Sequence, residues 1–226
     1  MRGVFDIIGP IMIGPSSSHT AGAARLGLMA GKILGEKPVK AEILLHGSFA
    51  QTYRGHGTDK ALLGGILGFA PEDMRLREAL NIAAQQGLVY SFAPVDIPEA
   101  HPNTAIIKLT GESGRVIQVE GASVGGGNIR ITRIGDFDVD LTGKYPALII
   151  VHKDRPGVVN GVTSILARYK INIAYMRVSR KMRGQEAMMI VETDDELSTE
   201  VVEDCSEIPR LLKAFAIPAI GGGSTI

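Results

Sequence analysis

The sequence predicts an α+β protein in which N-terminal helices precede a mainly antiparallel sheet and a βαββαβ module follows. Apolar residues recur with helical spacing up to about residue 87 and alternate with a period of two over residues 88–132. After a stretch of turn and acidic residues at 136–146, the predicted order is strand, helix, two strands, helix and strand. We therefore expect one domain over residues 1–142 and a second over residues 146–226.

Three helices are predicted in the first domain. The first covers residues 22–35, and Arg25 lies off its apolar stripe. The second lies around residues 62–67, where Thr58 can cap it, although three nearby glycines each cost about 1 kcal/mol relative to alanine. The third, at residues 76–84, repeats the apolar stripe and ends at a glycine.

The strands of the first domain are recognised by apolar or β-branched runs between turn residues. A triple glycine at residues 125–127 precedes a strand rather than a helix, so it indicates a β-bulge or close packing and not a nucleotide-binding loop. The predicted strands are residues 41–45, 88–92, 104–110, 115–120 and 128–132.

The second module has its own sequence of elements. Its apolar first strand is followed by a turn at residues 154–157 and an amphipathic helix that ends near Tyr169. The strands are predicted at residues 147–151, 172–180, 186–192 and 211–217, and a short helix at 198–207.

The composition excludes several classes of protein. The chain has 226 residues and equal numbers of basic and acidic side chains, 24 of each, which argues against electrostatic binding of nucleic acid. No apolar run approaches the roughly 18 residues of a membrane span, and no secretory leader is recognisable, so we expect a reducing cytoplasm. The single cysteine, Cys205, cannot supply the thiolates of a metal cluster alone, so metal chemistry would need ligands from elsewhere.

The segment Gly-Pro-Ser-Ser-Ser-His-Thr at residues 14–20 is the one that packing explains least. It places hydroxyl groups, an imidazole and free backbone N–H groups at the start of a helix, where a carboxylate or phosphate is favoured. An ordinary N-cap needs one serine, so an anion site and a simple cap are both open. His19 titrates near neutral pH and can accept or donate a proton.

Other polar residues gather around glycines. His46 and Ser48 follow the first strand, the segment Arg-Gly-His-Gly-Thr-Asp occupies residues 54–59, and His-Pro-Asn-Thr occupies residues 101–104. A lone histidine is more often structural than a ligand, but His19, His46 and His56 all lie in loops of this kind, which favours a site. His152 ends an apolar strand, where a structural or interfacial role is expected. Nucleotide-fold, P-loop, zincin and serine-hydrolase motifs are missing from the sequence.

Together these motifs closely resemble the β subunit of bacterial iron–sulfur-dependent L-serine dehydratases. The resemblance rests on residues 5–10, 14–20, 46–50, 55–59 and 101–104 and extends over essentially the whole chain. It implies conversion of L-serine to pyruvate and ammonia beside a partner α subunit, whose cysteines hold a [4Fe–4S] cluster that this chain does not bind. It also implies that the first domain is similar to the allosteric substrate-binding domain of phosphoglycerate dehydrogenases.

The resemblance assigns roles to the motif residues. We hypothesise that His19 is catalytic and takes part in proton transfer at the subunit interface, while the serine and threonine hydroxyls around it orient the substrate carboxylate. The predicted substrate-binding residues are Ser16, Ser17, Ser18, Thr20, His46, Ser48, His56, Thr58, Asp59 and Asn103.

The second module, through residues 151–159 and 171–173, resembles an ACT domain, a ferredoxin-like regulatory module that commonly binds amino acids and pairs with another copy. Its Asp-Arg-Pro-Gly turn is expected to cap the first helix and expose backbone donors for a small amino acid. A dimerisation module without a ligand is the alternative. The predicted regulatory-ligand residues are Asp154, Pro156, Gly157, Val158, Asn172 and Ile173.

Two further functions compete with the dehydratase subunit. A purely regulatory protein would sense serine in the helix-entry pocket without performing chemistry. A fragment of a phosphoglycerate dehydrogenase is the other, but the nucleotide-binding fingerprint is missing. The expected partners are therefore the α subunit, L-serine and a second copy of the chain, with neither nucleic acid nor a membrane.

Overall fold

The computed structural model describes residues 12–221, so the segment at 5–10 that contributes to the resemblance lies outside the described residues. By its contacts the chain divides into one unit that ends at Gly135 and a second that begins at Asp136, and each is described by itself. No helix between residues 12 and 221 is long and apolar enough to cross a membrane. The domain limits at 142 and 146 stay predictions.

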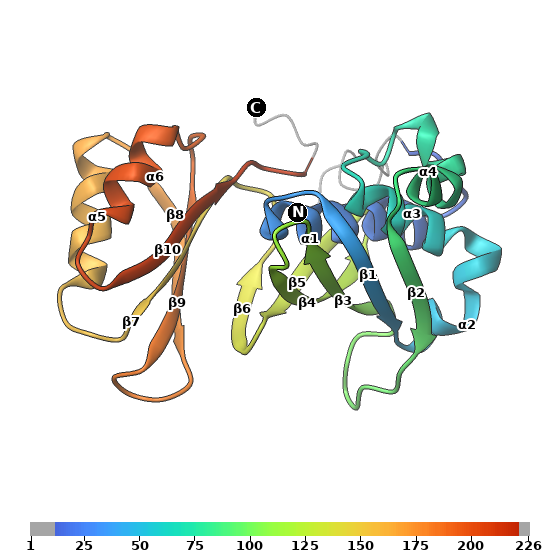
Figure 1. The fold of residues 1–226 in the computed structure, drawn as a ribbon, viewed down its shortest axis with the longest axis horizontal. Coiled ribbons are helices and arrows are strands. Elements are labelled where there is room, and N and C mark those ends of the chain that lie inside the picture. The colour runs from blue at the N-terminus through green and yellow to red at the C-terminus, as the bar shows by residue number, and fades with distance from the viewer. Residues whose placement is uncertain (1–11, 222–226) are drawn as a thin grey trace, which may run out of the picture. The chain divides into compact units, whose positions relative to one another are not determined.

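The first unit combines helices with a mainly antiparallel sheet, which confirms the predicted α+β class (Figure 1). Strand β1 pairs in parallel with β2 and antiparallel with β3, and the pairs β3–β4 and β4–β5 are also antiparallel. Within this unit the strands lie in the order β2-β1-β3-β4-β5. Its helical elements are the π-helical turn Ser17–Gly22, α1 (Ala23–Leu34), α2 (Gly47–His56), α3 (Thr58–Ile66), a 3₁₀ turn (Met74–Glu78) and α4 (Ala79–Gln85). Its strands are β1 (Pro38–Leu45), β2 (Val89–Pro94), β3 (Thr104–Gly111), β4 (Val116–Gly125) and β5 (Asn128–Ile134). Strand β6 (Phe137–Leu141) lies beyond Gly135 and belongs to the second unit.

Helix α1 packs its apolar stripe on the sheet and on α3, where Leu26, Met29 and Ile33 are each 1% exposed. Arg25 departs from the pattern, because a residue off the stripe is expected at the surface and this one is 8% exposed. Its Nη1 donates a hydrogen bond of 2.7 Å to the carbonyl oxygen of Gly127, and burial lowers the pKa of the guanidinium. The long side chain therefore ties α1 to the β4–β5 turn.

The triple glycine forms that turn, beside a β-bulge of the kind that the sequence predicts. Gly125, Gly126 and Gly127 all have positive φ angles, of 98°, 60° and 76°. The register of β4 against β5 shifts between Ser123 and Gly125, which marks a bulge. The glycines are therefore required by left-handed backbone, and they bring a carbonyl oxygen to Arg25.

The glycines that weakened the second predicted helix have a packing role. A Cβ atom on Gly65 would lie 2.0 Å from the carbonyl oxygen of Ala24, and one on Gly27 would lie 2.1 Å from that of Leu62. Helices α1 and α3 therefore touch backbone to backbone. The expectation that Thr58 caps α3 is wrong, because the cap position is Gly57, with φ +70°, and Thr58 is the first residue of the helix.

The structure has a helix, α2, where the sequence indicated glycine-containing loops around the histidine motifs. Phe49 is the residue of this helix that is buried, so the segment lacks the apolar stripe by which a helix is recognised. Gly57 ends α2 in a left-handed conformation and the chain turns at once into α3. The motif residues therefore stand on two short, successive helices.

The second unit has the predicted βαββαβ order, and its four-stranded sheet is arranged β10-β7-β9-β8 with antiparallel neighbours. Helices α5 and α6 cover one face of the sheet (Figure 1). Leu148, Val162 and Met189 are among the residues of the core between them, together with Cys205. The elements are β7 (Ala147–Lys153), α5 (Val158–Arg168), β8 (Ile173–Arg180), β9 (Glu186–Thr193), α6 (Thr199–Ser206) and β10 (Leu211–Ile217).

Candidate functional site

His19 lies in the π-helical turn that leads into α1. Ser16 precedes the turn in an extended conformation, and its Oγ accepts a hydrogen bond of 3.2 Å from the backbone N–H of His19. The N–H of Thr20 donates to the carbonyl oxygen of Ser16 at 2.9 Å. Single π-helical turns of this kind occur often at functional sites, because they re-aim side chains within a helix.

The imidazole of His19 is held from two sides. Its Nε2 lies 3.1 Å from the Oγ of Ser48 in the first turn of α2, and its Nδ1 lies 3.5 Å from the Oγ of Ser16. The ring also packs edge-on against the rings of Phe49 and His56, at centroid distances of 5.2 Å and 4.9 Å. Residues 16, 19, 48 and 56, which the sequence connects only through separate motifs, therefore form one cluster.

The environment favours the neutral form of His19. Burial lowers the pKa of its imidazole, the neighbouring His56 lowers it further, and a hydrogen bond to the backbone of Ser48 opposes both. A neutral imidazole has a free lone pair on one nitrogen. His19 is therefore suited to accept a proton at neutral pH.

A cavity of about 270 Å³ lies next to this cluster. His56 belongs to both, since it contacts His19 and lines the cavity. Three cationic side chains line the same cavity, those of Arg54, Lys60 and Arg77. This excess of positive charge suits a small anion such as a carboxylate.

Thr20 also lines the cavity and is 4% exposed, and its Oγ1 has no hydrogen-bond partner among the described residues. A buried hydroxyl without a partner costs free energy unless a ligand or water satisfies it. Gly14, at φ +144°, packs against Thr20, and a Cβ there would lie 2.4 Å from that Oγ1. The glycine of the motif therefore makes room for the threonine hydroxyl.

The remaining hydroxyls of the motif differ from Thr20. Ser17 and Ser18 are partly exposed within the π-helical turn, and their side chains form no hydrogen bond within residues 12–221. They are free to meet a ligand. Thr58 is fully buried in α3 and does not line the cavity. Its Oγ1 lacks a hydrogen-bond partner in the described chain.

Two predicted site residues are bound to neighbouring backbone. The Nδ1 of His46 accepts a hydrogen bond of 3.1 Å from the N–H of Ile97, so this ring anchors the loop after β2. Asn103 lies in the turn before β3, where its carbonyl oxygen accepts a hydrogen bond from Ser123. The same turn touches α2, because the N–H of Phe49 donates to the carbonyl oxygen of Pro102 at 3.3 Å.

Asp59 sits in the first turn of α3 and is 9% exposed. Burial raises the pKa of its carboxyl group, and a hydrogen bond of 2.8 Å from the backbone N–H of Lys60 opposes this effect. Sequence reasoning missed Lys60 and Arg77 as members of the site. Lys60 directly follows the Gly-His-Gly-Thr-Asp motif and could have been included, whereas nothing near Arg77 in the sequence connects it with that motif.

In the second unit, the Asp-Arg-Pro-Gly turn precedes α5 and supplies its cap residue, as expected from the sequence. The cap position is Gly157, with φ +95°, and no side chain bonds to the helix there. Asp154 instead accepts hydrogen bonds from the N–H of Gly184 at 3.0 Å and from Arg180 at 2.8 Å. These bonds, the first more than the second, hold the pKa of Asp154 below its usual value.

The predicted regulatory-ligand residues do not meet within one chain. Lys153, next to Asp154, pairs with the start of β9 at Glu186, whereas Ile173 pairs with Thr193 at the end of that strand. The two groups are therefore separated by the length of β9, roughly 23 Å. Val158 is 2% exposed in the core, Pro156 and Gly157 are exposed at the turn, and the Nδ2 of Asn172 donates to Asp194 at 2.7 Å.

The described residues do not provide a metal-cluster site. Between residues 12 and 221, His, Cys, Asp and Glu side chains form no group of three or more that could hold a metal ion. Cys205 is fully buried in the core of the second unit, where burial raises the pKa of its thiol to about 11. A thiolate, the form that binds iron, is therefore disfavoured at this position.

Comparisons with known proteins match two parts of the chain to two families. The family profile described as serine dehydratase beta chain matches residues 3–88, and the ACT domain profile matches residues 147–210. The chain is 44% identical over 216 residues to the probable L-serine dehydratase beta chain of Bacillus subtilis, covering 96% of this chain and 98% of that one. It is 37% identical over 211 residues to the L-serine dehydratase beta chain of Peptoniphilus asaccharolyticus, covering 93% and 95%.

A more distant likeness concerns another enzyme. The chain is 28% identical over 198 residues to the D-3-phosphoglycerate dehydrogenase of Bacillus subtilis, which covers 86% of this chain but 37% of that protein. The shared part is thus a minor portion of the dehydrogenase, whereas the dehydratase beta chains match almost end to end. The chain belongs to the serine dehydratase beta chain family, with an ACT domain in its second half.

Proposed function

We propose that this chain is the β subunit of a two-subunit L-serine dehydratase (L-serine ammonia-lyase), which converts L-serine to pyruvate and ammonia. The observation that supports it most is the imidazole of His19, which Ser48 fixes beside a cationic cavity and whose pKa burial lowers. That arrangement provides a base and an anion site in a chain that is 44% identical to a probable L-serine dehydratase beta chain.

The reaction is an elimination followed by hydrolysis. The α-proton and the β-hydroxyl group of serine leave as water, which gives aminoacrylate. This enamine tautomerises to an imine, and water then replaces the nitrogen to give pyruvate and ammonia. The difficult steps are removal of a weakly acidic α-proton and departure of hydroxide, and a positioned base assists the first.

Each group of the site has a proposed role in this scheme. The substrate carboxylate binds the cationic cavity through Arg54, Lys60 and Arg77, with the Oγ1 of Thr20 as a further donor. Hydroxyl groups of the π-helical turn orient the same carboxylate. His19 accepts the α-proton, and the hydrogen bond to Ser48 fixes the direction in which its ring points.

A partner α subunit is proposed to hold the [4Fe–4S] cluster of the enzyme. The described part of this chain does not fit such a cluster, since it lacks a group of metal-binding side chains and its cysteine is buried. The roles given above are therefore confined to residues of this chain. The reducing cytoplasm is the compartment proposed for the complex, because cysteine-bound clusters and a free thiol persist there.

The pH dependence tests the role of His19 as a base. The acid limb of kcat/KM should lie below pH about 6.5, since His19 must be neutral to accept the proton and its pKa is lowered. In His56→Asn, one cause of that lowering is removed, so the limb should move to higher pH. The pH profile of the reconstituted complex measures this shift. His101→Asn, at an exposed histidine, should leave the limb in place, and a limb unmoved by His56→Asn contradicts the proposal.

Self-association through the ACT domain is proposed from the separation of its two predicted ligand-contacting groups. One small ligand can touch both the turn at Asp154 and the strand start at Asn172 only if a second copy supplies one of them. We expect the purified chain to sediment as a dimer or larger assembly at micromolar concentration. A monomer at every concentration, with and without added L-serine, would count against a ligand site shared between copies.

The function itself is tested by anaerobic copurification with a candidate α subunit, followed by a serine-dependent pyruvate assay. The complex should form pyruvate from L-serine, and this chain alone should not. Binding of L-serine without turnover in any such complex would indicate a sensor instead.

A further inference from the structure

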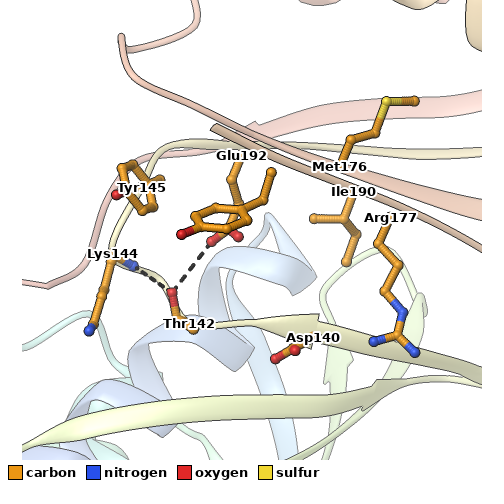
Figure 2. A pocket seen from close by; sticks show the side chains of 9 residues that line it. Asp140, Thr142, Lys144, Tyr145, Met176, Arg177, Ile190 and Glu192 are labelled. Atoms are coloured by element: carbon orange, nitrogen blue, oxygen red, sulfur yellow. Dashed lines mark hydrogen bonds between the residues drawn. The ribbon is translucent and has the colours of Figure 1, made fainter. Parts of the chain in front are cut away.

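A second cavity, of about 470 Å³, lies within the second unit and belongs neither to the His19 cluster nor to the predicted regulatory-ligand residues. Its walls come from β8, β9 and the segment from β6 to Tyr145 (Figure 2). Pockets of this size are typical of sites for small molecules.

The strand pairing explains why the lining residues share one face. Tyr175 lies opposite Glu192, and Arg177 lies opposite Ile190, in the antiparallel pair β8–β9. Because side chains alternate along a strand, these four residues project from the same face of the sheet. The core residues Met189 and Val191 project from the other face, toward α5 and α6.

Glu192 is the buried charge of this cavity. The residue is 5% exposed, and its side chain accepts a long hydrogen bond of 3.5 Å from the Oγ1 of Thr142. Burial raises the pKa of its carboxyl group and the nearby Asp140 adds to the effect, whereas hydrogen bonds from the backbone and the side chain of Thr142 oppose it. A buried carboxylate whose hydrogen bonds come from Thr142 and which lies near a second carboxylate is costly, and a bound cation would compensate for it.

A cation lines the same cavity without pairing with that carboxylate. Arg177 is exposed and its guanidinium has no hydrogen bond or ion pair within residues 12–221. In Figure 2 the side chains of Glu192, Ile190 and Arg177 lie in a row, with the apolar side chain between the two charged ones. One wall therefore presents a negative group, an apolar surface and a positive group in succession.

Two tyrosine rings line the cavity together with Glu192. Tyr145 and Tyr175 pack edge to face, with centroids 5.8 Å apart, and both line the cavity with Glu192. Aromatic faces attract ammonium groups and also provide apolar contact area. They reinforce the preference for a cation at the Glu192 end.

We propose that this cavity binds a small aminocarboxylate zwitterion with an apolar body, its ammonium group at Glu192 and the tyrosines, its carboxylate at Arg177 and its apolar part on Ile190. Such a ligand bridges two opposite charges that the protein leaves unpaired with each other. The proposal goes beyond the dehydratase reaction and does not depend on it.

The test uses the full chain and a reporter inside the cavity. The sequence has no tryptophan, so in Tyr175→Trp the fluorescence arises from this position alone. Tyr175 is 62% exposed, which makes the substitution compatible with folding. L-Leucine should change the emission in a saturable manner, whereas 4-methylpentanoate and 3-methylbutylamine, which each lack one of the two charges, should bind at least about tenfold more weakly.

Two variants address the two ends of the cavity separately. In the reporter background, Glu192→Gln and Arg177→Gln should each weaken L-leucine binding about tenfold or more. Glu186→Gln is the matched control, since this exposed residue of β9 pairs with Lys153 and does not line the cavity. Arg177 is exposed, so its variant remains informative if Glu192→Gln folds poorly.

Equilibrium dialysis of radiolabelled L-leucine with the unaltered chain repeats the measurement without the reporter. The proposal is overturned if neither method detects binding at millimolar L-leucine. It is also overturned if a one-charge analogue binds as tightly as L-leucine, or if Glu192→Gln and Arg177→Gln both bind like the parent.

Discussion

In the reconstituted complex, His19→Ala is expected to lower kcat by a factor of about 10² to 10⁴, the range that positioned general bases contribute. The reason is that His19 is the imidazole that Ser48 orients at 3.1 Å beside the cationic cavity. KM for L-serine should change much less, because the proposed carboxylate contacts lie on other residues.

The assay for His19→Ala is pyruvate formation from L-serine under anaerobic conditions, with the iron content of the complex measured in parallel. His101→Ala is the matched control, because that exposed histidine lies outside the predicted site, and its complex should turn over at the parent rate. If His19→Ala keeps the parent kcat with an intact cluster, His19 is not the base.

The second large effect concerns stability. Gly65→Ala and Gly27→Ala are each expected to lower the free energy of unfolding by about 3 kcal/mol, the upper end of ordinary overpacking. The added methyl groups would lie 2.0 Å and 2.1 Å from carbonyl oxygens of the facing helix, and backbone cannot move aside as a side chain can. Because α1 continues directly from the turn that holds His19, activity should fall with stability.

Urea unfolding curves measure this loss of stability. Equal slopes for the parent chain and the variants check that unfolding stays two-state. Gly55→Ala is the matched control within a helix, since a Cβ there would meet nothing within 4 Å. It should be neutral or stabilise by up to about 1 kcal/mol. If Gly65→Ala and Gly27→Ala unfold at the same urea concentration as Gly55→Ala, the close helix contact is refuted.

The sequence predicted best those elements whose apolar pattern agrees with their local propensity. Helix α1 has a continuous stripe with a glycine after it, and the βαββαβ unit has short apolar strands separated by turn residues, so both were recognised. Helix α2 was missed because Phe49 is its buried residue and polar residues dominate the rest. In α3 the glycines lower the intrinsic helix propensity, but the helix needs them because its backbone touches that of α1.

For the site, the sequence motifs identified the residues of the His19 cluster but not all the cationic residues of the neighbouring cavity. Residues 16, 19, 48 and 56 come together as one group, although whether each contacts substrate stays a prediction. Arg77 joins the cavity only through the packing of the 3₁₀ turn before α4, which no local pattern records. The pairing of Asp154 with the turn at Gly184 was equally hidden, because it depends on strand register.

We propose above that this chain completes an active site whose metal is held by another subunit. The most direct measurement is the rate of pyruvate formation as this chain is titrated anaerobically into a cluster-containing α subunit at fixed concentration. We predict no turnover by either subunit alone and a rate that rises to a plateau at a defined molar ratio, with His19→Ala forming the same complex but almost inactive. Full turnover by the α subunit without this chain, or turnover by this chain without it, would contradict the claim.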